Sequence, residues 1–530
     1  MNHADQNIRT LLMLQQQLRI SEAEAKKWAE LPFRVRLEAD RDFLDSPNGQ
    51  YAVTLSVNIL CRFHPIVTHL DISIPDTELK VPIPLIRGSS LKAGLREFIA
   101  RLEPLLKVSF NSPTTSHDSI LAVGNTPSTH EFKITIASEG WNAFASRSLI
   151  QSVSTHGAIN PIGSYVSACL GCGEIFKEAF GLKADALIRD RSSYDPRYRI
   201  RVLEGSIKFS ALDYSINSDL APNPPLPESV DIGETFIVGV GAGGGAVTYA
   251  LASLPRIIGH LFLVDPDEIT PSNLNRYVYA LKSDAAEGIS KVSAAAQLFE
   301  SRTIVLTTFH GPYLDFVKAW RNREMDLVVS TVDTDQTRRD IQWDLPRIIL
   351  DAASVGTEYY VLRVDLGEGA CLHCTHEPPT EALEPALSRL TGLSTEDILS
   401  LRKNNGRFTL THVSTMRSFC ERNKIPLPKV GERFSDWLVD HCGEIRLPVQ
   451  NVTVPIPHAT ILPGILIAGE IIKERHYNAY KLSNMYVQDI FSIPSKGYRT
   501  HLAPREDCQF CRNERVMNRY SEKHLKVLDK

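Results

Sequence analysis

The stretch Gly239-Val240-Gly241-Ala242-Gly243-Gly244 decides the fold, because it lies between an apolar run and a helical run of small residues. Phe236 to Val238 is predicted to be a buried strand and Ala246 to Leu254 the following helix, so the glycines lie where strand becomes helix. Without Cβ atoms they let backbone N–H groups approach phosphate oxygens, which the positive end of the helix dipole also attracts. The pattern predicts a Rossmann-like nucleotide-binding domain with a mostly parallel sheet; the alternative is a tight turn that serves packing only.

A second strand and two acidic residues follow. His260 to Val264 is predicted to be a parallel strand, and Asp265 ends it about 20 residues past the last turn glycine. An acidic residue at this spacing accepts hydrogen bonds from ribose hydroxyls, and Asp267 follows two residues later. The residues expected to bind one nucleotide across this βαβ unit are Gly239, Gly241, Gly244, Asp265 and Asp267.

Polar residues beyond the second strand favour ATP over NAD. Asn273 and Arg276 fall in a short loop or helical turn, where an amide and a guanidinium can hold a triphosphate, and Lys291 opens a predicted helix and adds a second cation. Asp333 follows the apolar strand Leu327 to Ser330 at the carboxyl edge of the sheet, where a carboxylate beside a triphosphate suits Mg²⁺. Each of these residues alone favours the interpretation of a separate solvated side chain, but all four in this order after the glycine turn favour a site.

This order resembles the ubiquitin-activating enzyme superfamily, which includes ThiF and MoeB. That family carries a glycine turn, Asp-x-Asp, Ser-Asn-Leu-x-Arg, Lys and Thr-Asp-Asn-x-x-x-Arg, and the matching positions here include Ser272 to Arg276, Lys291, Asp333 and Arg338. Thr334 departs from the usual Asn. The resemblance covers about 231 to 511. It implies adenylation of the C-terminal carboxylate of a small ubiquitin-like protein, with Arg276 and Lys291 on the phosphates and Asp333 on Mg²⁺.

Two CxxC pairs predict a zinc site. Cys371 and Cys374 form one pair, Cys508 and Cys511 the other, and this spacing lets two thiolates of one turn share a tetrahedral ion. A zinc joining the pairs would tie the end of the chain to the nucleotide-binding domain. A redox role for the pairs is the alternative. Members of the ubiquitin-activating enzyme superfamily, which this chain resembles, often carry such a zinc.

A thioester mechanism would need a further cysteine as nucleophile. Cys442, in Asp440-His441-Cys442-Gly443-Glu444, lies in a polar break beside a histidine, which suits a thiolate that must reach an acyl-adenylate. Cys420, in a polar helical segment, is the second candidate, and a mechanism without a cysteine stays open. In the ubiquitin-activating enzyme superfamily, which this chain resembles, the thioester cysteine usually precedes the last conserved helix, here Pro463 to Lys473.

The N-terminal half contains an echo of that last helix. Gly469-Glu470-Ile471-Ile472-Lys473-Glu474 nearly repeats Gly173-Glu174-Ile175-Phe176-Lys177-Glu178. Chance is one explanation; the other is that the N-terminal region is a divergent α/β domain, a degenerate adenylation-like half that forms a pseudo-dimer with the active half. Ser119 to Gly124 would then be its first strand and turn. Arg9 or Arg19 could reach across to the triphosphate.

Composition and linkers set the domain boundaries and partners. The chain has 530 residues, is 43% apolar and carries a net charge of −4 without a basic run, so nucleic acid is not an expected partner. The proline-rich segment 221–228 separates domain 1–228 from domain 229–530, which contains an inserted cysteine-bearing region at about 377–448. The sequence shows no secretory signal and no membrane span, so we expect a soluble, cytoplasmic protein.

The function expected from all these features is ATP-dependent activation of a ubiquitin-like protein. Adenylation would be followed by thioester formation on the enzyme and transfer to a conjugating-enzyme-like acceptor, with ATP, Mg²⁺ and Zn²⁺ required. Within the superfamily, the chain looks most like the activating enzymes of bacterial conjugation operons such as the Bil antiphage system. The alternatives are an enzyme that adenylates a sulfur carrier or a small molecule, an NAD-dependent oxidoreductase, and a non-catalytic scaffold. The pseudo-dimer would lie within one chain, or the chain would form a homodimer.

Overall fold

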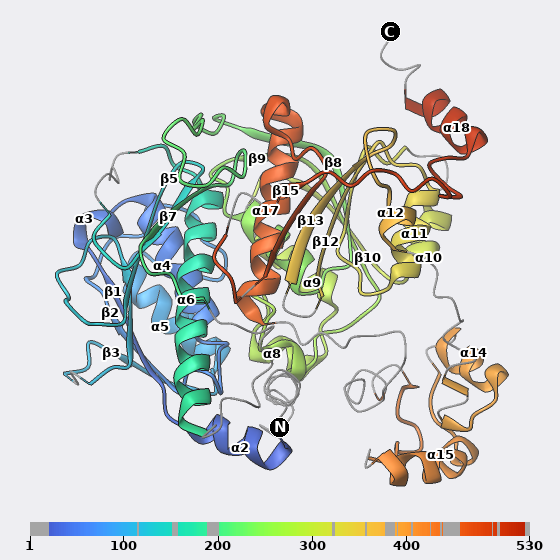
Figure 1. Ribbon diagram of the computed structural model, residues 1–530, viewed down its shortest axis with the longest axis horizontal. Helices are drawn as coiled ribbons and strands as arrows, with labels where there is room; N and C mark the ends of the chain where they lie inside the picture. Colours follow the sequence, from blue (N-terminus) through green and yellow to red (C-terminus); the bar gives the residue numbers. More distant parts are fainter. Residues whose placement is uncertain are drawn as a thin grey trace. The chain divides into compact units, whose positions relative to one another are not determined.

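The structure, a computed structural model, divides into two compact units (Figure 1). The larger unit comprises Met1–His376 and Pro455–Lys530, and the smaller Glu377–Val454. The described residues are 21–113, 116–150, 157–187, 201–300, 302–320, 324–355, 358–376, 387–388, 391–403, 406–423, 426–434, 437, 456–489, 491–494 and 499–524.

The first sheet of the larger unit has the strand order β3-β2-β1-β4-β5-β6-β7. Strands β1 to β5 pair in parallel, and β6 and β7 add antiparallel. The strands are β1 Arg34–Ala39, β2 His69–Ser73, β3 Lys107–Phe110, β4 Ser119–Val123, β5 Lys133–Glu139, β6 Asn142–Ser146 and β7 Ser206–Ser210.

The second sheet has the order β10-β9-β8-β11-β12-β13-β14-β15. Strands β8 to β12 pair in parallel, and β13, β14 and β15 add antiparallel. The strands are β8 Val230–Val238, β9 Ile257–Asp265, β10 Val305–His310, β11 Leu327–Ser330, β12 Ile348–Val355, β13 Glu358–Asp365, β14 Met485–Asp489 and β15 Arg499–Thr500. Its first seven strands therefore repeat the order of the first sheet, and the expected fold of two mostly parallel α/β halves is confirmed.

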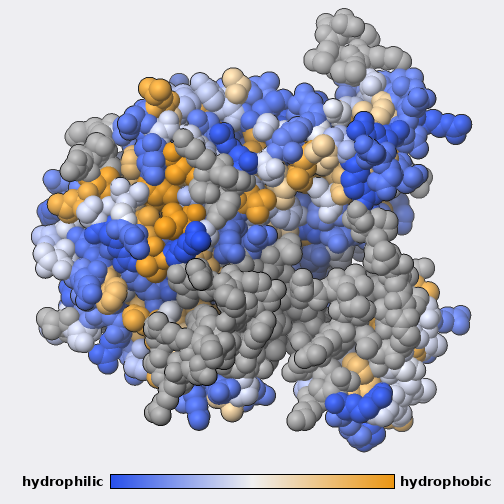
Figure 2. Space-filling model, in the orientation of Figure 1, coloured by the Kyte–Doolittle hydropathy of each residue, from blue (hydrophilic) through white to orange (hydrophobic). Residues whose placement is uncertain are grey.

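Four helices form the layer between the sheets: α4 Pro47–Leu60 and α6 Pro161–Leu187 from the first half, α7 Ala242–Ala252 and α17 Pro457–His476 from the second. α6 packs against α17, and the two run side by side (Figure 1). These helices are buried on almost every side, because α4, α6 and α17 each pack on a sheet and on another helix and α7 packs on α17. Figure 2 shows hydrophobic residues gathered over the region of α6 on one face of the molecule, whereas most other coloured surface there is hydrophilic.

The remaining helices of the larger unit cover the outer faces and the connections. They are α2 Glu22–Glu30, α3 Arg41–Leu44, α5 Leu91–Leu102, α8 Lys282–Glu287, α9 Lys291–Ala296, α10 Tyr313–Ala319, α11 Asp335–Trp343, α12 Leu372–Thr375 and α18 Glu514–His524, with 3-10 turns η3 Pro271–Asn273, η4 Gln297–Phe299 and η5 Asn478–Tyr480.

The repeated hexapeptide lies at equivalent positions of the two halves. Glu174 pairs with Lys177 inside α6, and Glu470 pairs with Lys473 inside α17. The Glu174 carboxylate accepts the N–H of Leu203, just before β7, and the Glu470 carboxylate accepts the N–H of Leu482, just before β14. The two copies of the hexapeptide therefore make the same buried contacts in the two halves.

The first strand of the N-terminal half is not where the sequence placed it. Ser119 to Val123 is β4, which corresponds to β11 in the strand order, and β1 Arg34–Ala39 occupies the central position of β8. The prediction failed because Ser119 to Gly124 has the apolar run and glycine of a nucleotide-binding strand, whereas β1 alternates charged and apolar residues. The turn after β1 begins with Asp40, which caps α3 by accepting the N–H of Phe43.

The smaller unit has its own apolar core. It contains α14 Thr395–Lys403 and α15 Leu410–Asn423, and Phe408, Met416, Cys420 and Trp437 are among the residues buried in it. Within the described part of the chain, no helix is both long enough and apolar enough to cross a membrane.

Candidate functional site

The glycine turn joins β8 to α7, as predicted, and steric crowding determines where glycine is needed. Gly239 has φ +87°, and a Cβ there would lie 2.8 Å from the backbone of Thr331. A Cβ on Gly244 would lie 2.0 Å from the Gly239 carbonyl oxygen, so this glycine lets α7 pack against the turn. A Cβ on Gly241 would meet nothing closer than the Tyr277 hydroxyl at 3.4 Å. The outer side of the turn is thus open for a phosphate, which fits ATP.

Asp265 ties the turn to the end of β9. One of its carboxylate oxygens accepts the Val240 N–H at 2.6 Å and the other accepts the Asp267 N–H at 2.9 Å. Burial raises the pKa of Asp265, and Lys291 opposes that rise. Asp265 therefore shapes the turn, while the Asp267 side chain is 62% exposed and more open to a ligand.

Lys291, at the start of α9, lies beside both acids. Its Nζ is 2.6 Å from Asp267 Oδ2 and 3.5 Å from Asp265 Oδ1. Burial works against the charged amine, but Tyr277 and the two carboxylates outweigh it and raise the pKa of Lys291 above its usual value. The amine is therefore a fixed cation at the glycine turn.

The segment after η3 carries the second cation. Arg276 donates to the Ser272 carbonyl and to Asn275 Oδ1, and its guanidinium lies 5.1 Å from the centre of the Tyr277 ring. Lys291 Nζ lies 5.7 Å from the same ring, so one aromatic side chain supports both cations. Asn273 accepts the Thr270 N–H with its side-chain oxygen and closes the turn. The sequence analysis missed Tyr277, although its place next to Arg276 was the available signal.

Asp333 is exposed in the loop between β11 and α11. This loop adjoins the glycine turn, because β11 pairs with β8 and the Thr331 hydroxyl donates to the Gly239 carbonyl. Thr334, the departure from the family motif, caps α11 by accepting the Thr337 N–H. An exposed carboxylate beside the turn and its cations fits a Mg²⁺ ligand.

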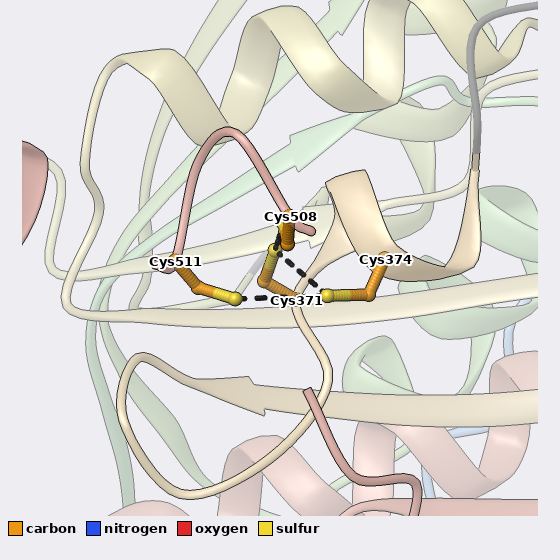
Figure 3. A group of neighbouring side chains, drawn as sticks. All are labelled: Cys371, Cys374, Cys508 and Cys511. Carbon is orange, nitrogen blue, oxygen red and sulfur yellow. Dashed lines mark hydrogen bonds between the residues drawn. The ribbon is translucent and has the colours of Figure 1, made fainter. Parts of the chain in front are cut away.

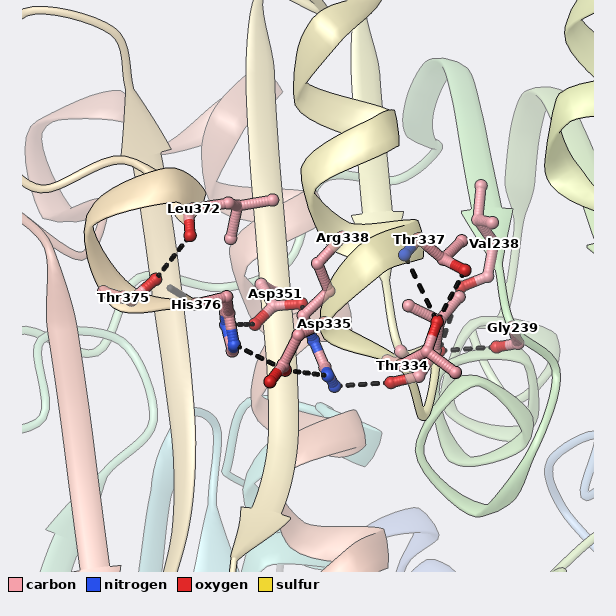
Figure 4. A network of polar contacts seen from close by, with 12 residues as sticks. Val238, Gly239, Thr334, Asp335, Thr337, Arg338, Asp351, Leu372, Thr375 and His376 are labelled. Atoms are coloured by element: carbon pink, nitrogen blue, oxygen red, sulfur yellow. Dashed lines mark hydrogen bonds and ion pairs between the residues drawn. The ribbon is translucent and has the colours of Figure 1, made fainter. Parts of the chain in front are cut away.

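Arg338 fixes the loop between β11 and α11 through a network of polar contacts (Figure 4). It donates to the Val332 carbonyl and, through Nε at 3.0 Å, to Asp351. Asp351 also accepts the Tyr360 hydroxyl at 2.7 Å, and His376 bonds Asp335 at 2.9 Å. Burial opposes the charge on Asp351, yet Arg338 and His376 hold the pKa of Asp351 well below its usual range. Asp351, Tyr360 and His376 were not predicted; Asp351, an acid directly after the apolar run 348–350, was the available signal.

The sulfur atoms of the four predicted zinc ligands all lie within 4.8 Å of one another (Figure 3). The Sγ atoms of Cys371 and Cys374 are 3.7 Å apart, those of Cys371 and Cys508 3.7 Å, and those of Cys374 and Cys511 3.6 Å. A tetrahedral zinc with Zn–S bonds of about 2.3 Å needs sulfurs about 3.8 Å apart, so the residues fit the ion. His373 lies outside this group and stacks on Phe510, with ring centres 4.6 Å apart.

The two candidate nucleophiles have different outcomes. Cys442 lies outside the described residues, as do Arg9 and Arg19. Cys420 is only 2% exposed in the core of the smaller unit, and burial raises the pKa of its thiol. A protonated, buried thiol is a poor nucleophile, so the described structure disfavours Cys420.

The fold and the residues around the turn define a nucleotide-binding protein built from two Rossmann-like halves. Residues 229–486 match the ThiF family, and residues 34–193 match the BilD N-terminal domain. Together the two matches support a ThiF/MoeB-like activating enzyme of Bil type, with adenylation as its chemistry. It is also 24% identical over 494 residues to the uncharacterized protein y4jF of Sinorhizobium fredii, a similarity that covers 90% of this chain and 88% of that protein.

Proposed function

We propose that this chain activates the C-terminus of a ubiquitin-like protein, carries it as a thioester on Cys442 and passes it to a conjugating-enzyme-like acceptor. The proposal is supported by the position of Arg276 and Lys291 against Tyr277 beside the glycine turn, and by that of Asp333 after β11, the strand that pairs with β8. The ThiF and BilD N-terminal matches support a ubiquitin-like substrate and a Bil-type pathway, and we propose a role in antiviral defence.

In the first step a carboxylate oxygen of the small protein attacks the α-phosphorus of ATP. The bond between the α-phosphorus and the bridging oxygen breaks, so that acyl-AMP forms and pyrophosphate leaves. Arg276 and Lys291 are assigned to the phosphates, because fixed cations stabilise the charge that the leaving pyrophosphate gains. Asp333 would hold Mg²⁺, which supplies further charge neutralisation when bound.

In the second step the Cys442 thiolate attacks the acyl carbon and AMP leaves. The acyl-adenylate is already activated, so this thiol needs only modest activation. The region at about 377–448 is therefore proposed as an insertion that carries the nucleophile. Without the second step, the same adenylation would serve a sulfur carrier or a small molecule.

ATP–pyrophosphate exchange with candidate small proteins tests the first step. We expect wild-type exchange to need the small protein, and Lys291→Ala and Asp333→Ala each to lower it by about 100-fold or more. Lys318→Ala is the matched control, because Lys318 is 65% exposed on α10 and, among the described residues, its ion pair is with Asp315 of the same helix. Exchange that needs no protein would favour a small-molecule substrate, and wild-type levels in both variants would contradict the assignment.

A reducible covalent adduct tests the second step. Cys442→Ala should abolish the DTT-sensitive gel shift of the small protein while exchange persists, and Cys420→Ala should keep the adduct as long as the chain folds. If Cys442→Ala kept the adduct, the thioester on this residue would be refuted. If the wild-type enzyme formed acyl-AMP without any covalent adduct, activation of a sulfur carrier would replace the proposed thioester transfer.

A further inference from the structure

Arg62, two residues after the end of α4, reaches from the N-terminal half into the half that contains the glycine turn. Its guanidinium donates to the carbonyl oxygen of Leu274 at 2.5 Å through Nη1 and to that of Ala280 at 3.0 Å through Nη2. Nε donates to Asn58 at 2.8 Å, and the Asn58 amide donates to the Val278 carbonyl at 2.8 Å. Two residues of the N-terminal half thus hold both ends and the middle of segment 274–280.

Burying the charged side chain of Arg62 costs more free energy than burying an apolar side chain that only fills space. Arg62 is 4% exposed, so its charged guanidinium lies away from solvent. A buried charge is expensive unless it is compensated, and here all three guanidinium nitrogens donate to oxygen atoms and Asp284 adds a favourable charge interaction. Burial lowers the pKa of Arg62 to about 10, so the side chain is still charged at neutral pH.

Segment 274–280 carries the parts of the nucleotide site that need accurate placement. Arg276 and the Tyr277 ring that supports both cations lie between the two ends that Arg62 holds. The Tyr279 hydroxyl donates to the Val240 carbonyl in the glycine turn at 2.5 Å. The Tyr279 ring is also packed so closely on α7 that a Cβ on Gly245 would lie 2.1 Å from it.

We propose that Arg62 is a positioning residue for ATP: the N-terminal half uses it, with Asn58, to set Arg276, Tyr277 and Tyr279 against the glycine turn. This inference rests on the proposed function. The N-terminal half would then contribute to the reaction of the second half. Arg62 would position the nucleotide indirectly, through segment 274–280, without touching the nucleotide itself.

The test compares Arg62→Gln and Arg62→Lys with Lys282→Gln. Lys282 is the matched control because it pairs with Glu103 across the same junction of the halves, on its exposed rim, and holds no part of segment 274–280. We expect Arg62→Gln to raise the KM for ATP in pyrophosphate exchange by about tenfold or more, with a smaller fall in kcat at saturating ATP. Arg62→Lys should recover part of this loss, and the control should match wild type.

A merely structural role would give a different pattern. It would lower the melting temperature and the active fraction, and hence kcat, while the KM for ATP stayed unchanged; that result in both Arg62 variants would overturn the proposal. If Arg62→Gln does not fold, Arg62→Lys decides on the same readout. Calorimetric titration with ATP alone separates the two proposals, because weaker ATP binding by the variants would still support positioning if wild type showed no exchange with any partner.

Discussion

At the scale of single residues, Lys291 forms ion pairs with two carboxylates of the proposed site. Its amine lies against Asp267 and Asp265, and the Tyr277 ring lies beneath it. A phosphate oxygen must therefore share this cation with the exposed Asp267 carboxylate. The buried Asp265 cannot move away, because backbone N–H groups occupy both of its oxygens. The pair holds the cation at the turn, ready for a ligand.

Two neighbouring glycines should respond differently to alanine. A Cβ on Gly244 would lie 2.0 Å from the Gly239 oxygen, whereas a Cβ on Gly243 would find its nearest atom, Cγ2 of Thr331, at 3.4 Å. We expect Gly244→Ala to lower stability by about 1–3 kcal/mol through overpacking. Gly243→Ala should be neutral or raise stability by up to about 1 kcal/mol, since alanine favours a helix. Thermal melts measure both, and equal melting temperatures would contradict the described turn.

At the scale of elements, the cysteine cluster joins α12 to the loop before α18. We expect one zinc per chain in purified protein, and its removal by a chelator should lower the melting temperature because the metal closes a long loop. Cys508→Ser should lose the metal, and Cys442→Ser should keep it. Metal analysis of the two variants checks this, and a metal-free wild type with an unchanged melt would refute the zinc site.

Asp326, just before β11, links that strand to β12 and α17. It pairs with Arg347 at 2.5 Å and with Arg475, and Arg347 also pairs with Glu474 at 2.8 Å. Burial opposes the charge on Asp326, but the arginines outweigh it and lower the pKa of Asp326 below its ordinary value of 3.8. A lowered folded-state pKa contributes stability above the unfolded value, and this stability is lost as pH falls through the folded value.

Asp326→Asn should therefore cost about 1–3 kcal/mol at pH 7, and the difference from wild type should shrink below pH 4. Melting temperatures measured from pH 3 to pH 8 check this. Asp315→Asn is the control, because Asp315 is an exposed acid whose ion pair, in the described part of the chain, is with Lys318. A difference that grew on acidification would contradict the sign of the pKa shift.

Elements with strong local signals could be predicted from the sequence, and positions fixed by distant pairing could not. The glycine turn, the strand that ends at Asp265 and the start of α9 at Lys291 follow from short patterns of apolar, small and charged residues. The position of β1 in its sheet depends on pairing with β2 and β4, far along the chain, so Ser119 to Gly124 was mistaken for it. The meeting of the two CxxC pairs was predicted because zinc chemistry demands it.

At the scale of the whole molecule, two halves with one strand order share a layer of four helices. The hexapeptide echo was the sequence signal of this relation, and its buried Glu–Lys pairs lie in that layer. The contacts between the halves could not be predicted, because nothing local marks Arg62 or Asn58 as partners of carbonyl groups more than two hundred positions away. Backbone carbonyls are present in every residue, so only the folded structure selects them.

The central claim is that this site joins a carboxyl terminus to AMP, and intact-mass spectrometry of the small protein tests it most directly. After incubation of Cys442→Ala enzyme with ATP, Mg²⁺ and the ubiquitin-like protein, we predict that the small protein gains the mass of one adenylyl group, which is AMP less one water, and that Lys291→Ala in the same background prevents the gain. An unmodified small protein with the Cys442→Ala enzyme, under conditions in which wild type consumes ATP, would contradict the account.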